Sequence, residues 1–309
     1  MVDKSLSDLT QPISYMRRTR EYYLALGYNN PYRWAHFDHV PFTVPRLKLH
    51  QMSVAIITTA ALYDPANGDQ RASAPYNAAA KFYQPYRQPI TPHPDLRISH
   101  VAIDRVHTHG EDDGAYFPLK AMHKAAENGV ISSVHPYFYG LPTNRSQKTT
   151  LEQDAEILLK WVKQDKPDAV IAVPNCPICH QSVSLVMRRL EEEGIPTLIM
   201  GCAKDIPEHV GVPRFYFSDF PLGNSAGLPH QPEAQYETLI EALSLFELAT
   251  APRSSITSSQ RWPSDPSWKQ DYSNPAKLTA DEIAERRKAF DMAKEKAAGI
   301  RNESASCSQ

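Results

Sequence analysis

The residues best suited to chemistry lie together in one short segment, Cys176-Pro177-Ile178-Cys179-His180. The apolar run 169–173 precedes this segment and a helical pattern follows it, so the spacing predicts that Cys176 lies at a strand-to-helix turn. A sulfur in that position meets unpaired N–H groups and the positive end of the helix dipole, and both stabilise a thiolate. Cys179, one turn later, can resolve a mixed disulfide or sulfenic acid on Cys176, and His180 can supply positive charge or a proton. The pattern therefore favours a reactive thiol pair.

Three other interpretations of this segment stay open. Cys-x-x-Cys-His is also the attachment motif of c-type haem, but that attachment normally follows export, and residues 1–6 show no secretory signal. A zinc site would need further ligands, and its set would be Cys176, Cys179, Cys202 and His180. The cysteines can also be buried and inert.

Further polar segments follow other predicted strands. The segment 104–113 carries two histidines and several carboxylates, so it can bind substrate, bind metal or shuttle protons, or it can be a purely structural polar loop. Segment 201–209 ends another predicted strand, and the glycine-rich turn 221–227 offers N–H groups that can hold a carboxylate. The predicted substrate-binding residues are Arg105, His107, His109, Cys202, Lys204 and Asn224, and Glu208 is an alternative proton donor to His180.

Helical patterns that alternate with short apolar runs predict an α/β fold with an open, mostly parallel, doubly wound sheet and helices on both faces. Strands are expected at 54–59, 99–104, 169–173, 196–200 and 214–217, and helices at 13–26, 118–127, 150–163, 177–193 and 234–249. The chain divides into an N-terminal aromatic arm (1–50), two α/β subdomains that can be similar (51–145 and 146–250), and a C-terminal extension (251–309). In that extension a Ser- and Pro-rich linker precedes a charged helix that begins with the capping box Thr279-Ala280-Asp281-Glu282, and the tail with Cys307 is expected to be disordered.

The overall composition narrows the classes of function. A formal net charge of −2 provides no field that would collect nucleic acid or anionic lipid. Apolar runs are shorter than the roughly 20 residues that span a bilayer, so we expect no membrane segment and a cytoplasmic location. The four cysteines are too few for a disulfide scaffold. The polar helix on its linker suggests a homo-oligomer.

Several segments together resemble the selenoprotein B subunits of the glycine, sarcosine, betaine and D-proline reductases. These segments are 95–100 (DLRISH), 117–119 (FPL), 128–131 (NGVI), 173–181 (VPNCPICHQ), 194–197 (GIPT), 211–214 (GVPR) and 219–224 (DFPLGN). In those reductases a selenocysteine attacks the carbon next to the substrate carbonyl and expels the amine, and a nearby cysteine resolves the product. The resemblance places Cys176 at the selenocysteine position and Cys179 at the resolving position. It also implies an amino acid-like substrate, a pyruvoyl-bearing or other partner subunit, and an external dithiol or thioredoxin-like electron donor. We expect no tightly bound cofactor apart from the zinc of the alternative given above.

The leading hypothesis is a thiol-dependent reductase that cleaves a carbon–heteroatom bond next to a carbonyl. A redox-neutral cysteine lyase, isomerase or racemase would use the same thiols and need no dithiol. A zinc- or redox-sensing subunit of a complex would need no turnover, and a metal enzyme with its ion at His107 and His109 would make the cysteines accessory.

Overall fold

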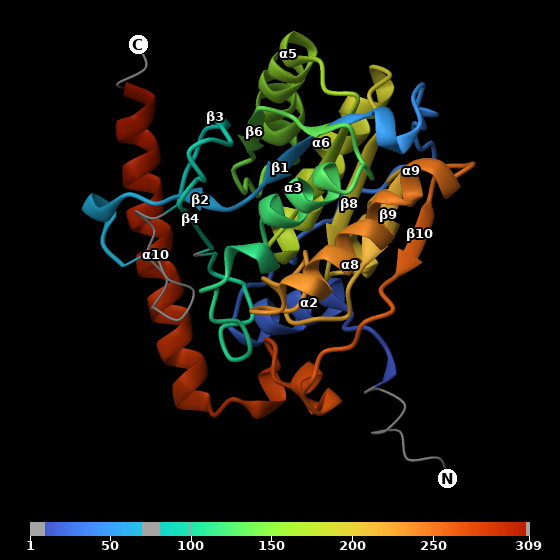
Figure 1. Ribbon diagram of the computed structural model, residues 1–309. Helices are drawn as coiled ribbons and strands as arrows, with labels where there is room; N and C mark the ends of the chain where they lie inside the picture. Colours follow the sequence, from blue (N-terminus) through green and yellow to red (C-terminus); the bar gives the residue numbers. More distant parts are fainter. Residues whose placement is uncertain (1–9, 70–80, 99, 307–309) are drawn as a thin grey trace.

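The computed structural model describes residues 10–69, 81–98 and 100–306 (Figure 1). One sheet has the strand order β10-β9-β8-β7-β1-β6-β3, with β5 also paired to β1. All pairs in it are parallel except β3 with β6. Its strands are β1 (Ser53–Thr58), β3 (Tyr86–Pro89), β5 (Ser133–Val134), β6 (Tyr137–Gly140), β7 (Ala169–Val173), β8 (Thr197–Gly201), β9 (Arg214–Phe217) and β10 (Ser254–Thr257). A separate antiparallel pair joins β2 (Ala61–Leu62) to β4 (Leu96–Arg97).

Helices cover both faces of the sheet because the central strands are apolar on both sides. In β1, Val54 and Ile56 belong to the core that also contains residues of α3 (Leu119–Glu127), α8 (Pro232–Leu243) and α9 (Leu245–Leu248). The alternate residues of the same strand, Ala55 and Ile57, belong to a second core with α5 (Ala155–Asp165) and α6 (Pro177–Glu192). Each fully buried isoleucine contributes about 1.5–3 kcal/mol, so the two-sided strands anchor both layers.

The predicted fold class is confirmed, and most predicted elements are present within a few residues. The helix expected at 150–163 begins as the short α4 (Gln147–Thr149) and a π-helical turn at Thr150–Asp154, and then continues as α5. The capping box also forms: Glu282 accepts hydrogen bonds from the backbone and hydroxyl of Thr279, and α10 (Ala280–Ser306) follows. Cys307 lies outside the described residues.

Two predictions of local structure are wrong. No strand forms over the described part of 99–104, because the Asp104 carboxylate accepts the N–H groups of Val106 and His107 and closes a turn; Ser99 is outside the described residues. The segment after residue 252 is expected to be a linker, but it contains β10, which pairs with β9. Backbone hydrogen bonds hold this strand in the sheet, and its sequence has no apolar pattern that would predict it.

The two expected subdomains share one sheet, since β1 lies between β6 and β7. The N-terminal arm packs on this body: Tyr15 of α2 (Tyr15–Ala25) lies in a third core with Trp268 and Tyr272 and residues of α6 and α7 (Asp205–Val210). Figure 1 shows α10 along the side of the molecule opposite β10. It contacts the arm where Phe290 meets Tyr23 and Tyr28 edge to face.

The helices of the described residues include none with the length and apolar character required to cross a membrane.

A buried ion pair between α6 and β9 binds the N-terminal arm (1–50) to the sheet. The guanidinium of Arg214 on β9 lies 2.8 Å from the carboxylate of Glu191 on α6, and neither side chain is exposed. Burial raises the pKa of Glu191 and lowers that of Arg214. Thr43 of the arm completes the pair, because its N–H donates to Glu191 and its carbonyl accepts from Arg214.

Arg214→Met should lower the free energy of unfolding by about 3–5 kcal/mol, because it leaves the Glu191 carboxylate buried without its counter-charge. Urea titration measures the loss. Lys148→Ala, which removes an exposed ion pair with Glu152, serves as the control and should leave the midpoint nearly unchanged. Equal losses of unfolding free energy in the two variants would show that the buried pair contributes no more to stability than the exposed pair.

Candidate functional site

Cys176 lies at the point where β7 ends and α6 begins, as the sequence predicted. It is the N-cap residue of α6, with Pro177 in the first helical turn, and its Sγ accepts the N–H of Cys179 at 3.2 Å. The two sulfurs form a disulfide, with Cα atoms 4.9 Å apart. The carboxyl edge of a parallel sheet is where ligands bind in folds of this class.

Both sulfurs are buried, although a reactive thiol pair needs access to its substrate. Cys176 is 4% exposed and Cys179 is not exposed. The neighbouring loops account for this: Ser225 donates to the carbonyl of Pro174, and the Thr143 hydroxyl lies 3.2 Å from the Cys179 sulfur. A substrate therefore reaches the sulfurs only when one of the covering segments moves.

His180 has a structural role in this arrangement. One ring nitrogen, Nδ1, contacts the Cys176 carbonyl oxygen at 2.8 Å, and Nε2 accepts the N–H groups of Cys202 and Ala203. These bonds fix the neutral tautomer with the proton on Nδ1, and burial lowers the pKa of His180 to about 4. The ring thus joins the cysteine turn to the end of β8, and we do not retain His180 as the source of charge or of a proton.

His100 is the histidine that lies beside the cysteine pair. A ring nitrogen of His100 and the sulfurs of Cys176 and Cys179 all lie within 4.8 Å of one another. Burial, together with the positive charges of Lys81 and Arg105, lowers the pKa of His100 to about 3. The imidazole is therefore neutral at physiological pH, and two cations lie near the sulfurs.

Lys81 and Arg105 are tied to this site by hydrogen bonds. The Lys81 ammonium donates to the carbonyl of Thr143, and Arg105 donates to the carbonyl of His100. Among the predicted substrate-binding residues, Arg105 thus contacts His100, the histidine beside the sulfurs.

Cys202, Lys204 and Glu208 follow β8 but have other surroundings. Cys202 is buried, and that burial raises the pKa of its thiol to about 12. Lys204 and Glu208 form a loose ion pair at 3.9 Å on α7. Glu208 also lines a surface hollow with Val212 and Arg253, which precede β9 and β10, so it lies toward the amino edge of the sheet. We therefore do not retain Glu208 as the proton donor.

The zinc set suggested by the sequence does not converge. Both nitrogens of His180 already have partners, and Cys202 bonds to Ser225 at 3.6 Å. Within the described residues, the group whose ligand atoms come together is His100, Cys176 and Cys179.

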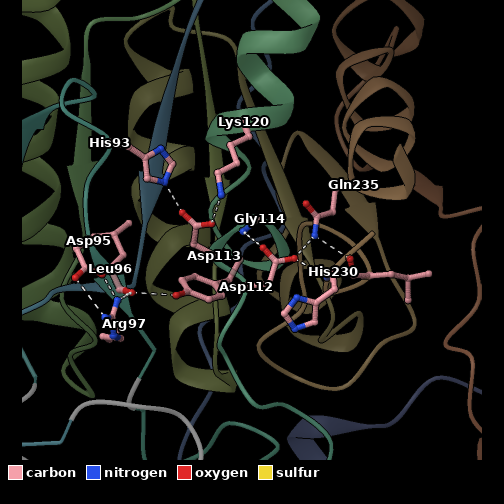
Figure 2. A network of polar contacts seen from close by, with 12 residues as sticks. His93, Asp95, Leu96, Arg97, Asp112, Asp113, Gly114, Lys120, His230 and Gln235 are labelled. Atoms are coloured by element: carbon pink, nitrogen blue, oxygen red, sulfur yellow. Dashed lines mark hydrogen bonds and ion pairs between the residues drawn. The ribbon is translucent and has the colours of Figure 1, made fainter. Parts of the chain in front are cut away.

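The polar segment 104–113 is used for structural contacts. His107 contacts the Asp271 carboxylate at 2.9 Å, and His109 is exposed. Figure 2 shows the two aspartates at its end facing different partners: Asp112 accepts from His230 and Gln235, and Asp113 pairs with His93 and Lys120. The histidines and the carboxylates of this segment thus contact separate partners and do not face a common point. This arrangement does not support a metal site at His107 and His109.

Asn224 is also engaged within its own loop. Its amide donates to the Thr108 hydroxyl and to the carbonyl of Pro221, and the residue is 3% exposed. The turn 221–227 therefore holds the segment 104–108 in place at the sheet edge through hydrogen bonds.

The comparisons with known proteins identify the relatives of this chain. Residues 25–174 match the family model described as glycine/sarcosine/betaine reductase selenoprotein B. The D-proline reductase subunit gamma of Acetoanaerobium sticklandii is 28% identical over 221 residues, which is 69% of this chain and 88% of that protein. The chain is therefore similar to the selenoprotein B family over residues 25–174. The family-model match ends before Cys176, so the cysteine turn is assigned from this structure and not from that match.

Glycine reductase proteins are more distant relatives. The component B subunit gamma of Symbiobacterium thermophilum is 24% identical over 66% of this chain and 48% of its own length. The corresponding subunit of Peptoclostridium acidaminophilum is 24% identical over 72% of this chain and 51% of its own length. The chain thus spans about half the length of these two relatives. No solved structure matches the chain.

Sequence reasoning missed three residues at the site: His100, Lys81 and Thr143. His100 lies within segment 95–100, which resembles the family, but the strand expected at 99–104 gives it no position relative to Cys176. Lys81 and Thr143 lie in segments without periodicity, and no pattern of residue types marked them.

After reduction, alkylating agents should modify Cys176 much faster than Cys202. The N–H of Cys179 and the nearby cations favour the Cys176 thiolate, whereas the Cys202 thiol stays protonated. Peptide mass spectrometry after timed iodoacetamide exposure gives both rates in one sample. Equal rates would show that the turn does not activate its first sulfur.

His180 should make stability depend on pH. Its pKa is depressed in the folded state, so below about 6.5 the unfolded chain binds more protons. Stability from this group is therefore present above pH 6.5 and is lost as pH falls toward 4. Urea midpoints between pH 7 and 4.5 for the wild type and His180→Asn isolate the contribution, and parallel slopes in the two proteins would contradict it.

Proposed function

We propose that this chain is a thiol-dependent reductase subunit that cleaves a carbon–heteroatom bond next to a carbonyl in a small amino acid-like substrate. The observation that carries the proposal is the Cys176–Cys179 disulfide at the N-terminus of α6, at the carboxyl edge of the sheet. The named relatives are components of reductases, which supports reduction as the class of chemistry.

The proposed reaction balances with two thiols. The Cys176 thiolate attacks the carbon next to the carbonyl, a carbon–sulfur bond forms, and the amine leaves with a proton. Cys179 then attacks the Cys176 sulfur, and the carbon leaves with the electron pair and takes a second proton. The substrate carbon is reduced, the two thiols are oxidised to the disulfide, and their protons end on the amine and the carbon. An external dithiol restores the thiols.

The cations near the sulfurs support an anionic substrate. Lys81 and Arg105 both act on His100, which lies beside the pair, so a carboxylate there would meet two positive charges. A guanidinium binds a carboxylate with good geometry, and this keeps Arg105 as a proposed substrate-binding residue.

A partner subunit forms the second part of the proposal. The relatives are named as subunits or complex components. Because the sulfurs are buried in the isolated chain, we propose that a partner, with a pyruvoyl group or another electrophile, binds at this edge and gives the substrate access.

Cys176→Ser should abolish turnover, because a serine hydroxyl is neither the nucleophile nor a disulfide partner. Cys179→Ser should stop after one step and leave the substrate fragment attached to Cys176. Intact-protein mass spectrometry after incubation with candidate amino acids, the partner subunit and no reductant detects the adduct, and wild type should show the disulfide instead.

The thiol state of Cys202 in the same spectra is the internal control and should not change. Unchanged turnover by Cys176→Ser would overturn the proposal. Turnover that needs Cys176 but no dithiol would replace it with a redox-neutral lyase or racemase.

A further inference from the structure

We propose that the reduced cysteine pair, together with His100, binds one zinc ion, and that the disulfide and the metal exclude each other. This inference shares Cys176 and Cys179 with the proposed function but does not depend on reductase activity. It differs from the zinc set suggested by the sequence, because His100 replaces Cys202 and His180.

The geometry of the three ligand atoms carries the inference. They lie within 4.8 Å of one another, and neighbouring ligands in tetrahedral zinc sites lie roughly 3.5–3.8 Å apart, so small shifts after the disulfide opens suffice. Two cysteines and one histidine leave a fourth position for water or a substrate atom, as in zinc sites with an open position.

The orientation of His100 provides the second observation. Its Nδ1 is buried and has no hydrogen-bond partner among the residues that the structure describes. The ring also bonds to the backbone of Thr59, and since Nδ1 has no partner, that contact belongs to Nε2. A backbone carbonyl that holds one ring N–H and leaves the other nitrogen with its lone pair is the usual support of a metal-bound histidine.

The support extends from His100 to the cysteine turn through Thr59. The Thr59 hydroxyl accepts the backbone and side-chain N–H groups of Asn175, the residue before Cys176. The same threonine therefore positions the histidine and the turn that carries the sulfurs, and this gives the three ligands a common frame.

The charges at the site are compatible with zinc. Two thiolates balance the ion, and the neutral imidazole adds no charge. Lys81 and Arg105 oppose a free cation and favour the thiolates, and we expect them to weaken zinc binding without preventing it.

The redox step that links the two states balances as follows. A dithiol reductant gives two electrons and two protons to the Cys176–Cys179 disulfide and becomes a disulfide itself. Zinc then displaces the two protons from the thiols. Oxidation of the pair removes both sulfur ligands and releases the ion.

The test uses the full chain and zinc alone. Protein reduced under anaerobic conditions is dialysed against zinc and then against metal-free buffer, and elemental analysis should find one zinc per chain; protein kept as the disulfide should hold none. Cobalt added to the reduced chain should give the charge-transfer absorption of thiolate ligands, and zinc should protect Cys176 from alkylation.

His100→Ala should weaken zinc binding by about 100-fold or more, since loss of an outer partner alone costs 10–100-fold. His123→Ala, which removes an exposed histidine on α3, is the matched control and should bind zinc as wild type does. Circular dichroism confirms that both variants fold.

Two outcomes would overturn the inference: reduced protein that loses zinc on dialysis, or His100→Ala that binds zinc as tightly as wild type. Neither outcome would contradict the proposed reductase function, because that proposal is tested by turnover and by the Cys176 adduct. Conversely, tight zinc binding by a chain that never forms the adduct would support the metal site and reject the reductase.

Discussion

The structure depends on one constraint at the end of β7. The buried strand β7 is followed directly by a helix, and the N–H groups in the first turn of any helix lack backbone partners. Here a cysteine sulfur accepts one of them, from Cys179. The same bond that caps α6 therefore fixes the position of Cys176 and brings Cys179 next to it, so local helix formation and thiol chemistry have a common cause.

The central part of the fold could be predicted from the sequence because burial on both faces leaves a clear pattern. The run Ala169–Val173 is apolar throughout, and a proline follows Cys176, so strand, turn and helix were all predicted. The loops were harder. His100 and Asp104 lie in a segment whose apolar residues imitate a strand, and turn formation by the Asp104 carboxylate prevailed over that weak periodicity. β10 was not predicted because backbone hydrogen bonds to β9 hold this edge strand, and such bonds leave no pattern of residue types in the sequence.

The two histidines near the cysteines show why proximity in sequence misleads. His180 follows Cys179 directly, yet both of its nitrogens are occupied by backbone groups. His100 is 76 residues before Cys176 in the printed sequence, yet one of its ring nitrogens lies beside both sulfurs. Parallel sheets bring the ends of distant strands to one edge, so the chemistry of such an edge comes from loops that no local motif connects.

The link from His180 to the end of β8 also limits how the cysteine turn can be transplanted. Its ring spans from the Cys176 carbonyl to two backbone amides of the next strand's loop, so the pentapeptide has its shape only beside that second strand. Gly201 leaves room for the ring, because a Cβ there would come within 2.7 Å of Nε2. A graft of this motif into another scaffold would therefore have to carry two adjacent strand ends and a glycine, not five consecutive residues.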